Sequence, residues 1–363
     1  MSKRKINITI GKNKKPNIDL DLELDDIFDD EIINIKHDIK SIDDLIYLGN
    51  QYMPNKRYNI NLKKLYNLVP VLTKLKNIIG MDNIKQNITN QIIYFIQDFQ
   101  DKNSDMLHTV IQGPPGVGKT MLGEIIGEIY YKLDIIEKND SDSDYDNNLK
   151  FTIAKRSDLI GKYLGHTAAK TQEVINRSLG GVLFIDEAYS LGNEEGRDSY
   201  SKECIDTINQ NLTEKKNKLL VIIAGYKDAL DNCFFNYNEG LRRRFPFVYT
   251  IDSYNSNDLS RILCLMIKKL GSGWDVIIEQ ETLDKFFKEN IQFFPNYAGD
   301  IETLLFSIKI EHSRRVLFLD SDSDAKRKIN ITDVENALKT FKANKEKINQ
   351  PKTKSTSHLM MYV

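Results

Sequence analysis

A glycine-rich segment in the first third of the chain has the residue types and spacing of a phosphate-binding loop. It fits the pattern G-x-x-x-x-G-K-[ST] at every fixed position and comprises Gly113, Pro114, Pro115, Gly116, Val117, Gly118, Lys119 and Thr120. Glycines let backbone N–H groups turn toward phosphate oxygens, and the helix expected from Met121 onward adds partial positive charge. Lys119 should reach the β- and γ-phosphates, and the Thr120 hydroxyl should ligate Mg²⁺. The segment therefore predicts binding of a nucleoside triphosphate, taken as ATP, together with magnesium.

Two adjacent carboxylates follow an apolar run at 182–185 that has the composition of a buried strand. Buried parallel strands carry the residues at their carboxyl ends rigidly to one edge of the sheet. Asp186 is expected to hold Mg²⁺ through its water shell, and Glu187 to orient and deprotonate the attacking water. The plainer alternative is a strand followed by a polar turn. The phosphate loop upstream favours the catalytic interpretation.

Composition limits the classes of function. The 363 residues include 51 basic and 52 acidic side chains, so a global electrostatic case for nucleic-acid binding is absent, although a local basic patch would be compatible. No apolar run approaches membrane-spanning length, and the charged start lacks a hydrophobic core, so we expect a soluble, intracellular protein with the cytoplasm as the default compartment. Cys204, Cys233 and Cys264 have no paired spacing and are expected to be reduced thiols.

The order of apolar runs predicts an α/β fold with a parallel sheet wrapped by helices. The strand-like runs are His108–Gln112, Phe151–Ala154, Val182–Asp186, Leu219–Ala224 and Phe247–Ile251. Strands are expected to stop there, and segments 256–270, 281–291, 298–317 and 331–343 have helical spacing, with Thr332 as an N-cap of the last. The expected organisation is a flexible tail (1–40), a helical lead-in (41–78) that begins at the N-cap Ser41, a phosphate-loop domain (79–251), an all-helical domain (252–343) and a second flexible tail (344–363). The acidic segment 138–148 is expected to be a solvated loop.

Three motifs together resemble those of AAA+ ATPases: G-P-P-G-V-G-K-T, F-I-D-E-A and L-R-R-R-F. Finer features, I-G-K-Y-L-G-H-T-A, G-G-V-L-F-I-D-E-A-Y-S-L and I-I-A-G-Y, resemble the CbbX (CfxQ) and stage V sporulation K branch over roughly residues 70–345. The resemblance implies a P-loop α/β domain with a helical lid and a homo-oligomeric ring, usually hexameric. It also implies that Mg-ATP hydrolysis drives the remodelling of a protein client. It does not identify the client.

The resemblance also assigns roles to residues outside the phosphate loop. Tyr163 lies where the family has its central pore loop, and the aromatic side chain is expected to grip a client chain. Arg244 is the first choice for an arginine finger that acts on the neighbouring subunit's nucleotide, and Arg242 the second. A solvated or acid-paired face is the alternative for this arginine run, and Arg243 is expected only to support its neighbours.

Two positions depart from the family pattern. Tyr226 stands where many AAA+ proteins have a sensor-1 asparagine, so its role in positioning water is open. Gly299 stands where the sensor-2 arginine is expected. Residues Ile79 and Gly80 resemble the segment that contacts adenine through its backbone.

Two rival functions share this nucleotide site. One is a nucleic-acid motor or clamp-loader-like ATPase, against which the neutral composition and the aromatic pore loop argue. The other is a nucleotide-gated assembly scaffold with little turnover, which the missing sensor-2 arginine favours.

Overall fold

Five short strands of mostly β-branched and other apolar residues form a parallel sheet. They are β3 (Thr109–Gln112), β4 (Phe151–Ala154), β5 (Gly181–Ile185), β6 (Leu219–Gly225) and β7 (Phe247–Thr250). In the sheet their order is β4-β5-β6-β3-β7, which confirms the predicted α/β fold. The computed structural model describes residues 32–349 apart from positions 102–103, 138–148, 164, 194, 196–197, 239 and 321–323. The predictions for the tail segments 1–31 and 350–363 and for the acidic segment 138–148 lie outside these residues.

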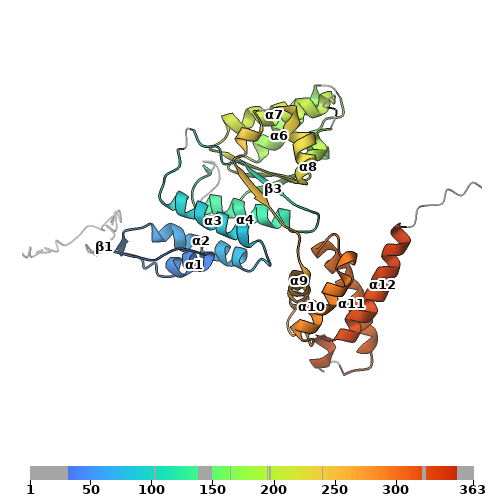
Figure 1. Cartoon of the computed structure of the whole chain (residues 1–363). Helices are drawn as coiled ribbons and strands as arrows, with labels where there is room; N and C mark the ends of the chain where they lie inside the picture. Colours follow the sequence, from blue (N-terminus) through green and yellow to red (C-terminus); the bar gives the residue numbers. More distant parts are fainter. Residues whose placement is uncertain are drawn as a thin grey trace, which may run out of the picture. The chain divides into compact units, whose positions relative to one another are not determined.

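Helices cover both faces of the sheet, which is why β5 and β6 are buried along their whole lengths. Figure 1 shows α6 (His166–Arg177) and α7 (Ser199–Glu214) on one side of the strands and α3 (Asp82–Ile96) and α4 (Lys119–Lys132) on the other. Leu183 and Ile185 of β5 belong to the core cluster under α6 and α7. On the other face, added Cβ atoms at Gly123 and Gly127 would lie 2.6 Å from Phe184 and 2.8 Å from Val182. The glycines therefore let α4 lie close against β5.

The N-terminal helices are α1 (Ile42–Gly49) and α2 (Leu62–Lys76). Ser41 precedes α1 as predicted, with the Asp44 carboxylate accepting its backbone N–H and its hydroxyl, both at 2.9 Å. Ile32–Ile33 (β1) pairs in parallel with Arg57–Tyr58 (β2), and the described residues 32–37 and 53–60 belong to a unit of their own. The segment predicted as a flexible tail (1–40) thus contains a short strand at its end, and the division of the chain into domains stays a prediction. Small elements complete the first part: α5 (Arg156–Leu159), the 3₁₀ turn η1 (Ala188–Leu191), α8 (Lys227–Ala229), the π-helical turn η2 (Leu230–Phe234) and the 3₁₀ turns η3 (Phe235–Tyr237) and η4 (Arg242–Arg244).

The C-terminal region is helical, as predicted, and contains α9 (Ser256–Lys268), α10 (Gln280–Asn290), the 3₁₀ turn η5 (Ile291–Phe293), α11 (Ala298–Arg315), the 3₁₀ turn η6 (Asp324–Arg327) and α12 (Ile331–Asn349) (Figure 1). The expectation that strands stop at Ile251 is wrong, because β8 (Asp275–Val276) and β9 (Lys328–Ile329) pair in parallel. Two-residue pairings are too short for a period-2 pattern to reveal.

The ends of α12 also differ from prediction. Thr332 lies inside the helix, and Asn330 is the cap instead: its side-chain oxygen accepts the N–H of Asp333 at 3.0 Å, and the Asp333 carboxylate accepts the N–H of Asn330 at 3.2 Å. The helix continues past the predicted boundary at 344 because Lys345 is anchored to its neighbours. Its ammonium lies 2.9 Å from the Asp300 carboxylate and donates to the carbonyl of Phe293 at 2.6 Å.

Candidate nucleotide-binding site

The phosphate loop connects β3 to α4, in the strand–loop–helix context that the motif requires. Gly116 and Gly118 have φ angles of 72° and 89°, a left-handed conformation that favours glycine. The Lys119 ammonium donates to the carbonyls of Gly113 and Pro114 at 3.0 and 2.8 Å, and so lies over the loop. Burial lowers the pKa of Lys119, and the nearby charges of Asp186 and Glu187 partly offset that effect. A cation held over a bend of backbone N–H groups is suited to bind phosphate.

The two predicted acids lie at the carboxyl end of β5. The backbone N–H of Asp186 continues the sheet ladder to Ala154 at 3.1 Å, and the Asp186 side chain accepts the N–H of Glu187 at 3.0 Å. Glu187 has a φ of 50°, which is uncommon for a residue with a side chain and turns the chain sharply after the strand. Both carboxylates act electrostatically on Lys119, so the structure brings together the predicted phosphate-binding and acidic residues.

Two tyrosines complete this cluster. The Lys119 ammonium lies 5.3 Å from the centre of the Tyr226 ring, and that ring lies 5.6 Å from the ring of Tyr189. Burial first, then the charge of Glu187 and its interaction with the hydroxyl, raises the pKa of Tyr189 to about 12. Tyr226 therefore faces Lys119 with its ring. Tyr189 was missed in the sequence, where its position directly after D-E-A was the available signal.

The predicted adenine-contacting segment lies beside the phosphate loop. Gly80 has a φ of 70°, and a Cβ there would lie 3.2 Å from the ring of Tyr254. The hydroxyl of Tyr254 donates to the carbonyl of Val117 at 3.0 Å, and burial raises its pKa to about 12. The neighbouring Ile79 is buried. Tyr254 thus connects Gly80 with the loop, and nothing in the sequence around Tyr254 indicated this.

The C-terminal region reaches the phosphate loop at the start of α11. The N–H of Ala298 donates to the carbonyl of Gly116 at 3.2 Å. A Cβ on Gly116 would lie 1.9 Å from the carbonyl oxygen of Asn296. Gly299 lies in this first turn, where the resemblance leads one to expect an arginine. The contact with the loop is therefore made by backbone atoms of this region.

Arg242, Arg243 and Arg244 form a single 3₁₀ turn before β7. Arg244 donates to the Thr213 hydroxyl at 2.9 Å and to the carbonyl of Gly240 at 2.8 Å. Arg242 pairs with Asp231, and its guanidinium lies over a phenylalanine ring at 4.4 Å. Among the contacts of the described residues, neither Arg242 nor Arg244 reaches the phosphate loop of its own chain. An arginine that serves a neighbouring copy is expected to lie apart in this way.

Tyr163 lies on the loop between α5 and α6 with 68% of its surface exposed. Its ring packs edge-on against His166, with centroids 5.5 Å apart. Gly165 has a φ of 84° and open space around it. The predicted client-binding side chain is therefore solvent-accessible.

The donor set next to the loop suits magnesium. Thr120 is the second residue of α4, directly after Lys119, and Asp186 lies in the same charged cluster; hydroxyl and carboxylate oxygens are ligands that Mg²⁺ prefers. Across the described ranges, no group of three or more His, Cys, Asp or Glu side chains could hold another metal. Among the described residues, Cys204, Cys233 and Cys264 are not joined by a disulfide. Every helix in the described part of the chain is too short or too polar to cross a membrane.

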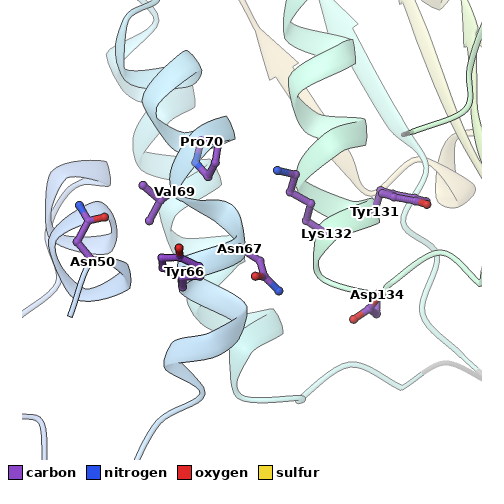
Figure 2. A pocket seen from close by; sticks show the side chains of 8 residues that line it. All are labelled: Asn50, Tyr66, Asn67, Val69, Pro70, Tyr131, Lys132 and Asp134. Carbon is purple, nitrogen blue, oxygen red and sulfur yellow. The ribbon is translucent and has the colours of Figure 1, made fainter. Parts of the chain in front are cut away.

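A groove of about 640 Å³ lies apart from these residues, between α2 and the C-terminal end of α4 (Figure 2). Asn67 and Pro70 of α2 and Lys132 of α4 line it. Lys132 is the last residue of α4 and Lys119 the first, so the groove is about 20 Å along the helix from the phosphate loop. None of its lining residues was predicted as a site residue.

Residues 109–253 match the ATPase family associated with various cellular activities (AAA). A putative CfxQ-like protein of Acanthamoeba polyphaga mimivirus is 41% identical over 327 residues, which cover 89% of this chain and 76% of that protein. Stage V sporulation protein K of Bacillus subtilis is 33% identical over 200 residues, 53% of this chain and 58% of its own length. A CfxQ homolog of Pyropia yezoensis is 32% identical over 238 residues, which cover 64% of this chain and 72% of that protein.

Among solved structures, the FIGL-1 AAA domain in complex with ADP aligns with a TM-score of 0.49 and 18% identity, covering 73% of this chain and 83% of that domain. The protein is an AAA+ ATPase, which binds and hydrolyses nucleotide. Within that class it belongs to the CfxQ-like (CbbX) family, as the sequence motifs predicted.

Proposed function

We propose that this ATPase assembles into a ring, with six copies as the expected number, and uses ATP hydrolysis to pull client proteins through the central pore. The observation that carries the proposal is Tyr163, an exposed aromatic side chain between Gly161 and Gly165. An aromatic face on a glycine-flanked loop offers contact area to an extended chain of any sequence. AAA+ ATPases are typically oligomeric, which supports a ring.

Within each copy we assign the chemistry to the cluster around Lys119. Thr120 and Asp186 would hold magnesium, which supplies positive charge to the β- and γ-phosphates when it is bound. Lys119 binds phosphate, and Glu187 accepts the proton of the attacking water. Arg244 of the next copy stabilises the charge that develops on the γ-phosphate. Residues 79–251 form the catalytic domain in this scheme, and the helices from 252 onward form its lid.

The test compares Tyr163→Ala with Tyr163→Phe, using a generic unfolded polypeptide as client and measuring unfolding or release per ATP hydrolysed. We expect the alanine variant to lose most of this coupling and the phenylalanine variant to keep it, because only the alanine variant loses the ring. Tyr66→Ala is the matched control, since Tyr66 is a 50% exposed tyrosine on α2. Equal coupling in all variants would reject pore-loop pulling. An ATPase stimulated by DNA or RNA instead of polypeptide would point to the nucleic-acid motor.

One observation favours a second candidate, a nucleotide-gated scaffold with little turnover. The first turn of α11 lies against the phosphate loop through backbone atoms, and Gly299 contributes no side chain there. A lid without an arginine near the γ-phosphate would distinguish ATP from ADP less strongly. Steady-state turnover decides the matter: a rate below one ATP per copy per hour, with stable nucleotide-dependent assembly, would favour the scaffold.

A further inference from the structure

The side chain of Arg156 joins α5, η1 and α7. Arg156 is the first residue of α5, shortly after β4. Its guanidinium donates to the carbonyl of Ser190 in η1 at 2.6 Å and to the carboxylate of Asp198, the N-cap of α7, at 2.9 Å. A longer bond of 3.3 Å reaches the Ser201 hydroxyl. The planar fork of N–H donors in arginine therefore holds three separate elements together.

One of these contacts leads to the proposed catalytic base. The N–H of Ser190 donates to the carbonyl of Glu187 at 2.7 Å, so the carbonyl that Arg156 holds belongs to the residue that closes the turn after Glu187. The ladder between β4 and β5 ends at the bond from the Asp186 N–H to the Ala154 carbonyl, so this turn begins directly beyond the fixed edge of the sheet. A left-handed residue such as Glu187 keeps its conformation only when its surroundings hold it. Arg156 thus restrains the backbone that orients the Glu187 carboxylate.

The backbone of Arg156 leads to the loop that carries Tyr163. The N–H of Ile160 donates to the carbonyl of Arg156 at 2.9 Å and closes α5, and Tyr163 follows three residues later. The ammonium of Lys170 in α6 donates to the carbonyls of Ser157 and Ile160 at 2.5 and 3.1 Å. The two helices on either side of Tyr163 are thus fixed to each other, and a displacement of α5 carries the loop with it.

The carboxylate of Asp198 is a charged partner for Arg156 at neutral pH. Hydrogen bonds from Ser201 and, to a lesser degree, from Arg156 lower the pKa of Asp198, against the effect of burial. Asp198 also accepts the N–H of Tyr200 at 3.0 Å and the Ser201 hydroxyl at 2.6 Å. The cap of α7 therefore does not depend on Arg156, and a variant at Arg156 is expected to fold.

We propose that Arg156 is a positioning residue that couples the nucleotide site to the client-binding loop. When the turn after Glu187 changes with the bound nucleotide, the guanidinium transmits the change to α5 and so to Tyr163. This inference rests on the proposed function, because it uses the roles given there to Glu187 and Tyr163. Energetic coupling between two sites is reciprocal, so a client that displaces Tyr163 also acts on the turn that carries the base.

A fluorescent reporter in the loop tests this link directly. Tyr163→Trp places an indole where the tyrosine ring packs against His166, so movement of the loop changes its surroundings. Trp274→Phe removes the single tryptophan of the sequence. The emission is compared between saturating AMP-PNP, a non-hydrolysable ATP analogue, and saturating ADP. We expect the two nucleotides to give different emission when Arg156 is present. Most of that difference should be lost in Arg156→Gln and part of it kept in Arg156→Lys, which retains the charge but not the fork of donors.

Arg315→Gln is the matched control. Arg315 also donates to a carboxylate, that of Asp333, and to a carbonyl, that of Lys328, at 2.9 and 2.8 Å. Its side chain is 33% exposed, against 40% for Arg156. Arg315→Gln should leave the difference between the two nucleotides unchanged. The inference is overturned by a reporter that does not respond to nucleotide when Arg156 is present, by an equal response in Arg156→Gln, or by an equal loss in Arg315→Gln.

The outcome is separable from that of the pulling mechanism. If Tyr163→Ala leaves client unfolding per ATP unchanged while the reporter still responds through Arg156, pulling is rejected and the link remains. If client unfolding depends on Tyr163 while the reporter responds equally with and without Arg156, pulling stands and the link is rejected.

Discussion

At the scale of single residues, the proposed roles assign nucleotide binding and chemistry to different side chains. Lys119 lies over the phosphate loop and holds two of its carbonyls, whereas Glu187 lies beyond it at the end of β5. We expect Lys119→Ala to abolish nucleotide binding. Glu187→Gln should bind Mg-ATP with near-wild-type affinity and hydrolyse it at least ~100-fold more slowly, the usual loss for a general base. Calorimetry and single-turnover assays measure the two effects. Normal turnover of Glu187→Gln would place the base elsewhere.

Tyr189 makes a finer prediction about the same base. Tyr189→Phe keeps the ring contact with Tyr226 but removes the hydroxyl that interacts with Glu187. We expect kcat to fall about 3- to 10-fold with KM unchanged, the range for one lost positioning hydrogen bond. The effect should vanish in a Glu187→Gln background, because the partner is then altered. Tyr237→Phe, which loses a hydroxyl bonded to Asn193, is the control. A changed KM or an additive effect would contradict a positioning role.

At the scale of elements, His108 makes the start of β3 sensitive to acid. Its Nε2 donates to the carbonyl of Leu212 at 2.9 Å and its Nδ1 accepts the N–H of Val221 at 3.1 Å, which requires the neutral ring. Burial lowers the pKa of His108 to about 4. The pKa of His108 in the unfolded chain is near 6.5. Between this pH and about pH 4, His108 is protonated in the unfolded chain but neutral in the folded chain. Stability is therefore lost as pH falls from about 6.5 to 4, by on the order of 3 kcal/mol in full.

The measurement is the free energy of unfolding in urea between pH 7 and pH 4, for wild type and His108→Gln. The variant should be less stable at pH 7, since it cannot reproduce both hydrogen bonds, but should lose less stability on acidification. Parallel pH profiles for the two proteins would show that His108 does not contribute.

Sequence patterns predicted the long secondary-structure elements but not the short ones. The five sheet strands and the four long C-terminal helices were predicted because apolar periodicity is strong in buried strands and amphipathic helices. The β8–β9 pair was missed, since pairings this short arise from tertiary packing. The cap at Asn330 and the extension of the helix through Lys345 depend on contacts with particular side chains, Asp333 and Asp300. Apolar periodicity carries no information about such contacts. In the site, motifs predicted the phosphate loop and both acids, whereas Tyr254 was invisible because it contacts the loop from 137 positions away in the sequence.

At the scale of the whole molecule, Arg244 predicts cooperation between copies. Arg244→Ala should bind ATP but lose most hydrolysis, by up to ~10³-fold. Mixed with Lys119→Ala, it should regain part of the activity, because some adjacent pairs then combine an intact loop with an intact arginine. Arg243→Ala, at the neighbouring position of the same turn, serves as the comparison. Mixed rings without any recovery would reject Arg244 and leave Arg242 as the candidate.

The hydrogen bond from Ala298 to Gly116 has a thermodynamic consequence. It joins the C-terminal helices to the loop that receives the phosphates, so any ligand that reshapes the loop shifts the free energy of this contact. This linkage is reciprocal. If nucleotide changes the affinity of the C-terminal helices for a partner by some factor, the partner changes the affinity for nucleotide by the same factor. Binding of a client or a neighbouring copy to the C-terminal helices alone would therefore change the dissociation constant for ATP.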